Sequence, residues 1–221
     1  MATQQMTYER IAQVVLAETG TTLAKRAGLR LTDEPAPLWQ LLVLTNLVSA
    51  RISTDIAIDA ARELNEAGGD TPEGMAQLTW QQRVDALGRG HYVRYDESTA
   101  SRLGGCARIA LDDYGGDLRN LAEESGRHYR KLEHRLQRFP GIGPTGAAIF
   151  CREAQAVWPW LRPFSDKLVS QGAERLGLPT QTEQLAHLVA PEDFAALAAG
   201  LVGVARDNAA LQQVRQAAGG R

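Results

Sequence analysis

Apolar residues recur at helical spacing along almost the whole chain, and no segment alternates apolar and polar residues over the length of a strand. The segment 37–51, PLWQLLVLTNLVSAR, is apolar on nearly every side, which predicts a buried central helix. Further helices are expected at 8–20, 54–69, 70–79, 80–90, 97–116, 129–138, 145–157, 165–177, 182–189 and 191–216. The pattern therefore predicts an all-α protein.

Composition narrows the classes of protein that fit. The 221 residues include 44% hydrophobic and 23% charged residues, which is typical of a globular protein. The net charge of −2 means that binding to a polyanion requires a local basic patch. The only cysteines, Cys106 and Cys151, exclude a disulfide framework and a four-cysteine metal or iron–sulfur site. We assign no metal to His91, His128 and His134, because they show no metal-ligand spacing.

The first twenty residues contain acidic groups and no long apolar core, so they are not expected to form a signal peptide. No apolar run approaches the roughly 20 residues of a membrane span. We therefore expect a cytoplasmic, bacterial protein with no membrane partner.

A cluster of turn residues lies at 139–150, FPGIGPTGAAIF, directly after a basic segment. Gly141 and Gly143 permit a tight turn and close backbone approach, and Pro144 favours the first turn of a helix. The N–H groups at that helix start suit a phosphate oxygen, although a plain αα-turn fits the same cluster. The basic segment contributes Arg127, Arg130, Lys131, Arg135 and Arg138.

The sequence FPGIGPTGAA resembles the hairpin of the helix–hairpin–helix DNA glycosylases, the endonuclease III superfamily. Segments 41–57, 70–92 and 162–171 (RPFSDKLVSQ) resemble, in order, other parts of that family, so the resemblance spans about residues 38–176. It implies a two-lobed fold with a cleft, in which 1–49 and 151–221 form one lobe and 50–150 the other, ending in the hairpin motif at about 129–150. It also implies excision of a flipped, damaged base from double-stranded DNA.

Asp166 matches the family's catalytic aspartate, whose carboxylate stabilises an electron-poor sugar and orients the attacking nucleophile. The alternative is an acid at a helix start, capped by Ser165. Bifunctional relatives carry a lysine on the helix after the hairpin, and the matching position here is Thr145. Because a hydroxyl cannot form an imine, we expect a monofunctional enzyme that uses water. No cofactor is expected, and the pattern is closer to the alkylpurine glycosylases, which implies an alkylated base.

Other residues are assigned by the same resemblance. The DNA-binding set is Gly141, Gly143, Thr145, Gly146, Arg51, Arg135 and Arg138. Arg51 matches a side chain that enters the gap left by the flipped base, and a surface ion pair with Asp55 is the alternative. The base pocket is assigned to Trp39, Tyr92, Tyr95 and Trp160, with core packing as the alternative for Trp39. A bifunctional glycosylase and a non-catalytic DNA-binding module of the same fold remain as rival functions.

Overall fold

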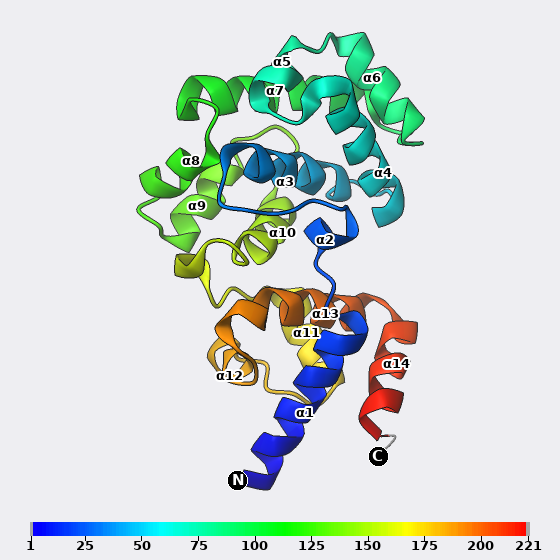
Figure 1. Ribbon diagram of the computed structural model, residues 1–221, viewed down its shortest axis with the longest axis vertical. Helices are drawn as coiled ribbons and strands as arrows, with labels where there is room; N and C mark the ends of the chain where they lie inside the picture. The colour runs from blue at the N-terminus through cyan, green and yellow to red at the C-terminus, as the bar shows by residue number, and fades with distance from the viewer. Residues whose placement is uncertain (1, 220–221) are drawn as a thin grey trace. The chain divides into compact units, whose positions relative to one another are not determined.

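The computed structural model describes residues 2–219, with side chains from residue 4 onward, and every regular element in this range is a helix (Figure 1). The prediction of an all-α protein is confirmed. The chain divides into two compact units, one of residues Ala24–Val157 and one of Met1–Leu23 with Trp158–Arg221. Each unit has its own buried core.

The larger unit is built around α3 (Pro35–Val48), which is the buried helix that the apolar segment predicts. Leu38, Trp39, Leu41 and Leu47 of α3 are fully buried. The helix packs against α4, α8 and α10, so its apolar faces are covered on several sides. The other elements are α4 (Thr54–Leu64), the π-turn η1 (Asn65–Gly69), α5 (Pro72–Gln77), α6 (Trp80–Arg89), α7 (Asp96–Tyr114), α8 (Leu118–Glu124), α9 (Tyr129–Leu136) and α10 (Pro144–Ala154), with α2 (Leu23–Arg26) at the entry to the unit.

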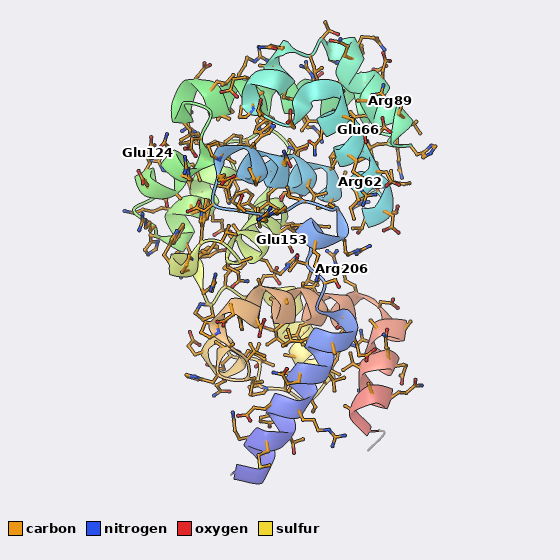
Figure 2. The ribbon with its side chains drawn as sticks, in the orientation of Figure 1. Arg62, Glu66, Arg89, Glu124, Glu153 and Arg206 are labelled. Carbon is orange, nitrogen blue, oxygen red and sulfur yellow. The ribbon has the colours of Figure 1, made fainter. Side chains whose placement is uncertain are left out.

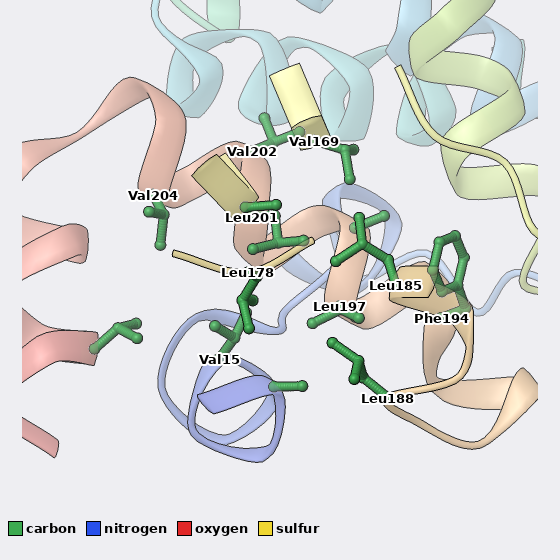
Figure 3. Packing of buried hydrophobic residues seen from close by; sticks show 14 of the residues in the cluster. Val15, Val169, Leu178, Leu185, Leu188, Phe194, Leu197, Leu201, Val202 and Val204 are labelled. Carbon is green, nitrogen blue, oxygen red and sulfur yellow. The ribbon is translucent and has the colours of Figure 1, made fainter. Parts of the chain in front are cut away.

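The smaller unit consists of α1 (Ala2–Thr19), the 3₁₀ turns η2 (Pro159–Leu161) and η3 (Pro191–Asp193), α11 (Lys167–Arg175), α12 (Thr182–Ala186), α13 (Phe194–Arg206) and α14 (Asn208–Gly219). Figure 3 shows its core, in which Val15, Val169, Leu185, Leu197 and Leu201 lie together. Helix α13 packs against α1, α11 and α14. The unit therefore fixes the start of α11, where Asp166 lies.

The unit boundaries differ from those expected from the sequence. We expected 1–49 with 151–221, and 50–150, but residues 24–49 and 151–157 belong to the larger unit. The reason is packing, because α3 is buried against helices of the larger unit. At the other end, Glu153 of α10 (labelled in Figure 2) accepts a hydrogen bond of 2.8 Å from the backbone N–H of Ala24.

Several helix ends also differ from expectation. The last predicted helix, 191–216, is divided into α13 and α14 at Asp207, whose backbone is extended and whose carboxylate accepts a bond of 2.8 Å from the N–H of Ala209. Helix α4 is capped by Ser53, the residue directly before the expected helix. Helix α8 was not expected, and its start is capped by Asp117. Short polar side chains that cap a new helix explain these breaks.

No single helix in residues 2–219 is long and apolar enough to cross a membrane. Only Pro191–Arg206 and Asn208–Gly219 meet the length and composition criteria when taken together, and they meet at a bend of 117°.

Candidate nucleic-acid interface and catalytic carboxylate

The predicted hairpin joins α9 to α10 in the larger unit. Helix α9 ends at Leu136, the N–H of Ile142 donates to the carbonyl of Phe139 at 3.0 Å, and α10 begins at Pro144. Phe139 and Ile142 are buried, whereas Gly141, Gly143 and Thr145 are exposed. The apolar side chains therefore anchor the turn, and its glycines face solvent.

Buried side chains of α3 and α7 form hydrogen bonds with the backbone of the hairpin. The buried side-chain amide of Asn46 donates to the carbonyl oxygen of Pro140 at 2.7 Å, and the Cys106 thiol donates to the same oxygen at 3.3 Å. Burial raises the pKa of Cys106 to about 12, although the charge of Arg102 and the hydrogen bond with Asn46 act in the opposite direction. The thiol therefore stays protonated and remains a donor at neutral pH.

The two hairpin glycines are required for different reasons. Gly141 has φ of +87°, and a Cβ there would lie 2.8 Å from both side-chain polar atoms of Asn46. Gly143 has φ of −96° and ψ of −170°, a conformation that any residue adopts, and a Cβ there would meet nothing within 4 Å. The fold thus explains the glycine at 141. It does not explain the glycine at 143, where a side chain would obstruct only a molecule outside the protein.

The start of α10 has no side-chain cap. Its N-cap residue is Gly143, and the first helical bond runs from the N–H of Ala147 to the carbonyl of Gly143 at 2.9 Å. The N–H groups of Thr145 and Gly146 therefore donate no hydrogen bond to a capping side chain. Thr145, which the sequence resemblance matches to a lysine of bifunctional glycosylases, is exposed on this first turn.

The loop after α3 lies beside the same helix start. A Cβ at Gly146 would be 2.9 Å from the hydroxyl oxygen of Ser49, two residues before Arg51. Arg51 is exposed, and the ion pair that we considered for it is not formed, because Asp55 pairs with Arg26 at 2.8 Å. The predicted gap-filling residue and the hairpin therefore belong to neighbouring segments of one unit.

The basic segment forms the solvent face of α9. Leu132 and Leu136 turn toward the core, and a surface hollow of about 560 Å³ is lined by Glu124, Arg130, Lys131, His134, Arg135 and Arg138. Two of the cations are paired, Arg135 with Glu124 at 2.7 Å and Arg138 with Asp113 at 2.8 Å. Figure 2 shows Glu124 on α8. Arg135 and Arg138, which we predicted to bind DNA, thus each form an ion pair with a carboxylate. Such exposed ion pairs contribute little to stability.

Asp166 is the N-cap of α11, in the smaller unit. Its Oδ1 accepts hydrogen bonds from the backbone N–H groups of Leu168 at 3.0 Å and Val169 at 3.1 Å. Asp166 itself caps the helix, and the Ser165 cap that we considered is not formed. The two bonds fix the orientation of the carboxylate, and the helix dipole complements its negative charge.

The aromatic residues assigned to a base pocket have different environments. Trp39 is fully buried and donates to the carbonyl of Gly69 at 3.0 Å, and Tyr92 is 1% exposed and donates to the carbonyl of Leu47 at 3.3 Å. Both positions favour core packing. Tyr95 is half-buried beneath the guanidinium of Arg94, 5.2 Å from its ring centre. In the smaller unit, half-buried Trp160 stacks on Trp158 with ring centres 5.4 Å apart.

The donors needed for metal or cluster binding are not assembled in the described chain. Residues 4–219 contain no group of three or more His, Cys, Asp or Glu side chains placed to hold a metal ion. An iron–sulfur cluster held by cysteines requires four thiolates. The whole chain has two cysteines, both buried, so its residues do not fit such a cluster.

Two features of the hairpin were not identified from the sequence. Asn46 was read only as part of an apolar helix, and Arg102 of α7 was not singled out, although its Cδ lies 3.1 Å from the Cβ position at Gly141. Both are distant from the hairpin along the chain. One available signal was a lone amide in the apolar segment LLVLTNLV, because a buried polar group needs a partner.

No protein-family model matches the sequence, and no curated protein matches it. Among solved structures, the chain is similar to a trapped covalent intermediate of endonuclease III with DNA, with 15% identity, a TM-score of 0.47 and coverage of 81% of this chain and 79% of the other. It is also similar to a non-covalent endonuclease III–DNA complex, with 16% identity, a TM-score of 0.49 and the same coverage.

Proposed function

We propose that this protein is a monofunctional DNA glycosylase that removes a damaged, alkylated base by hydrolysis of the N-glycosidic bond. The observation that carries the proposal is the start of α10, where an exposed glycine hairpin leads into an uncapped helix. Such a helix start binds anions through its N–H groups and dipole. A DNA phosphate is the anion that a glycine-lined, convex backbone turn admits and a side chain would exclude.

The DNA contacts then follow from the larger unit. The N–H groups of Thr145 and Gly146 hold a backbone phosphate, and Arg51 on the adjoining loop enters the duplex beside the flipped base. Arg135 and Arg138 add screened attraction to the same strand. The protein acts on double-stranded DNA as a monomer, and its place is the bacterial cytoplasm with the nucleoid.

The chemistry is assigned to Asp166. As the bond between base and sugar breaks, the base leaves with the bonding electrons and the sugar gains oxocarbenium character, which a carboxylate stabilises. Water then adds to C1′ and loses a proton to the carboxylate, which passes it to the departed base or to solvent, and an abasic site remains. The two backbone hydrogen bonds to Oδ1 hold Asp166 in one orientation for this role.

Strand cleavage is not part of the proposed reaction. The lyase step needs an amine that forms an imine with the sugar, and Thr145 has a hydroxyl at the matching position. The chain has only three lysines, Lys25, Lys131 and Lys167. Lys131 lies on α9 before the hairpin, and Lys167 is the first residue of α11.

The test is the substitution Asp166→Asn, because asparagine keeps the capping oxygen and leaves the helix start intact. We expect base release to fall by about a hundredfold to ten-thousandfold while DNA affinity is unchanged or higher. Base release under single turnover and binding to the same duplex are measured side by side. The matched control is Asp207→Asn, because Asp207 also caps a helix of the smaller unit and lies after α13.

The expected result is that Asp207→Asn retains wild-type activity. Wild-type base release by Asp166→Asn would remove this residue from the mechanism. If the wild-type protein binds DNA but releases no base from any damaged duplex, the non-catalytic DNA-binding module is the correct function.

A further inference from the structure

We infer that Arg102 of α7 is a DNA-phosphate-binding residue, which supplies the side-chain cation of the hairpin. The inference rests on the proposed function, because it takes DNA as the ligand. It concerns a residue that does not belong to the hairpin motif and lies about forty positions before it in the chain.

The first observation is the position of the Arg102 side chain relative to the hairpin. The Cδ of Arg102 lies 3.1 Å from the place that a Cβ would take at Gly141, so the arginine stem rests on the exposed hairpin backbone. The charge of Arg102 also acts on the thiol of Cys106, which donates to the carbonyl of Pro140. The Arg102 side chain therefore lies beside the turn.

The second observation is a pair of glycines in α7, next to this contact. The segment SRLGGC, residues 101–106, contains a pair of glycines inside a long helix, where glycine is unfavourable. A Cβ at Gly105 would lie 3.2 Å from Pro140, and a Cβ at Gly104 would lie 2.8 Å from the guanidinium of Arg83. Gly105 thus lets the hairpin approach α7, which brings Arg102 beside it.

The third observation is that the charge of Arg102 is not neutralised. Arg102 is exposed and forms no hydrogen bond or ion pair with another residue in the range 4–219. Arg135 and Arg138, by contrast, are each bound to a carboxylate. An exposed cation without a partner, beside a backbone turn that suits a phosphate, adds a charge-assisted contact to the same anion or its neighbour.

The test compares Arg102→Gln with Arg108→Gln, an exposed arginine on the same helix that interacts with the charge of Arg83 instead of the hairpin. The probe is a short duplex with one abasic-site analogue, titrated at several salt concentrations. We expect Arg102→Gln to weaken binding about threefold to tenfold at low salt and to reduce the salt slope by about one. Arg102→Lys should keep the slope, and Arg108→Gln should behave like wild type.

A salt slope and affinity of Arg102→Gln equal to those of wild type would overturn the inference and leave the proposed function standing. Equal losses in Arg102→Gln and Arg108→Gln would also overturn it, since the effect would then come from net charge alone. If the wild-type protein binds no DNA, the proposed function and this inference both fail.

Discussion

The starts of α10 and α11 are built in opposite ways. At α10 the cap position is Gly143, no side chain bonds the first N–H groups, and the turn is exposed. At α11 the cap is Asp166, whose own carboxylate accepts two of those bonds. One helix start is therefore ready to receive an anion from outside, and the other presents a fixed anion. The proposed function uses the first start to bind a DNA phosphate and the second to stabilise a developing cation.

The largest expected effect comes from breaking the hairpin itself. Gly141→Ala places a side chain at φ of +87° and within 2.8 Å of Asn46. We expect the free energy of unfolding to fall by about 2 kcal/mol or more, because both strain and a lost fit at the Asn46 contact contribute. Denaturant unfolding measures this loss. A stability equal to wild type would mean that the turn is not held by the Asn46 contact.

A smaller and more selective effect is expected when the open start of α10 is filled. Gly143→Ala adds a methyl group that meets nothing within 4 Å, so stability should fall by less than about 1 kcal/mol. DNA affinity should fall by about tenfold for every sequence alike, since the contact is to the backbone. Unfolding and DNA titration on one preparation separate the two properties. Unchanged affinity would return this segment to a plain structural turn.

Removal of the carboxylates that pair with Arg135 and Arg138 should increase DNA affinity. Asp113→Asn frees Arg138, and Glu124→Gln frees Arg135. Each change should raise DNA affinity about twofold to threefold at low salt and steepen the salt dependence, because a phosphate no longer competes with a carboxylate. Arg138→Gln should have the opposite effect on the slope. If neither carboxylate variant changes the slope, the face of α9 does not touch DNA.

The smallest expected effect tests the first turn of α10 as a place for an amine. Thr145→Lys puts an ammonium group on the exposed position that the sequence resemblance matches to the lysine of bifunctional glycosylases. We expect a slight gain of strand cleavage at abasic sites and weak covalent trapping by borohydride. Thr145→Gln controls for length without an amine. Equal trapping of both variants would show that the amine at this position is not responsible.

The features that depend on residues close together in the chain could be predicted from the sequence. The helical class, the buried helix α3, the turn at Gly141 and the helix start at Pro144 follow from periodicity and from the conformations of glycine and proline. The break at Asp207 was missed because a cap inside a periodic segment looks like an ordinary polar position.

Contacts between distant segments were not predictable in this way. The bond from Asn46 to the carbonyl of Pro140 joins residues 94 positions apart. The position of Arg102 depends on Gly105, whose role is visible only when Pro140 packs on it. The unit boundary was misplaced for the same reason. The apolar sequence of α3 shows that the helix is buried, but it does not show in which unit. The catalytic role of Asp166 stays a prediction.

The central claim is tested most directly by product analysis on a panel of duplexes, each with one damaged base, under single turnover. For at least one duplex, we predict a free base and an abasic strand that breaks only after alkali, with no covalent adduct after borohydride. Strand cleavage without alkali, with an adduct that is lost in Lys131→Ala or Lys167→Ala, would contradict the monofunctional reaction. Failure to release any base would contradict the glycosylase itself.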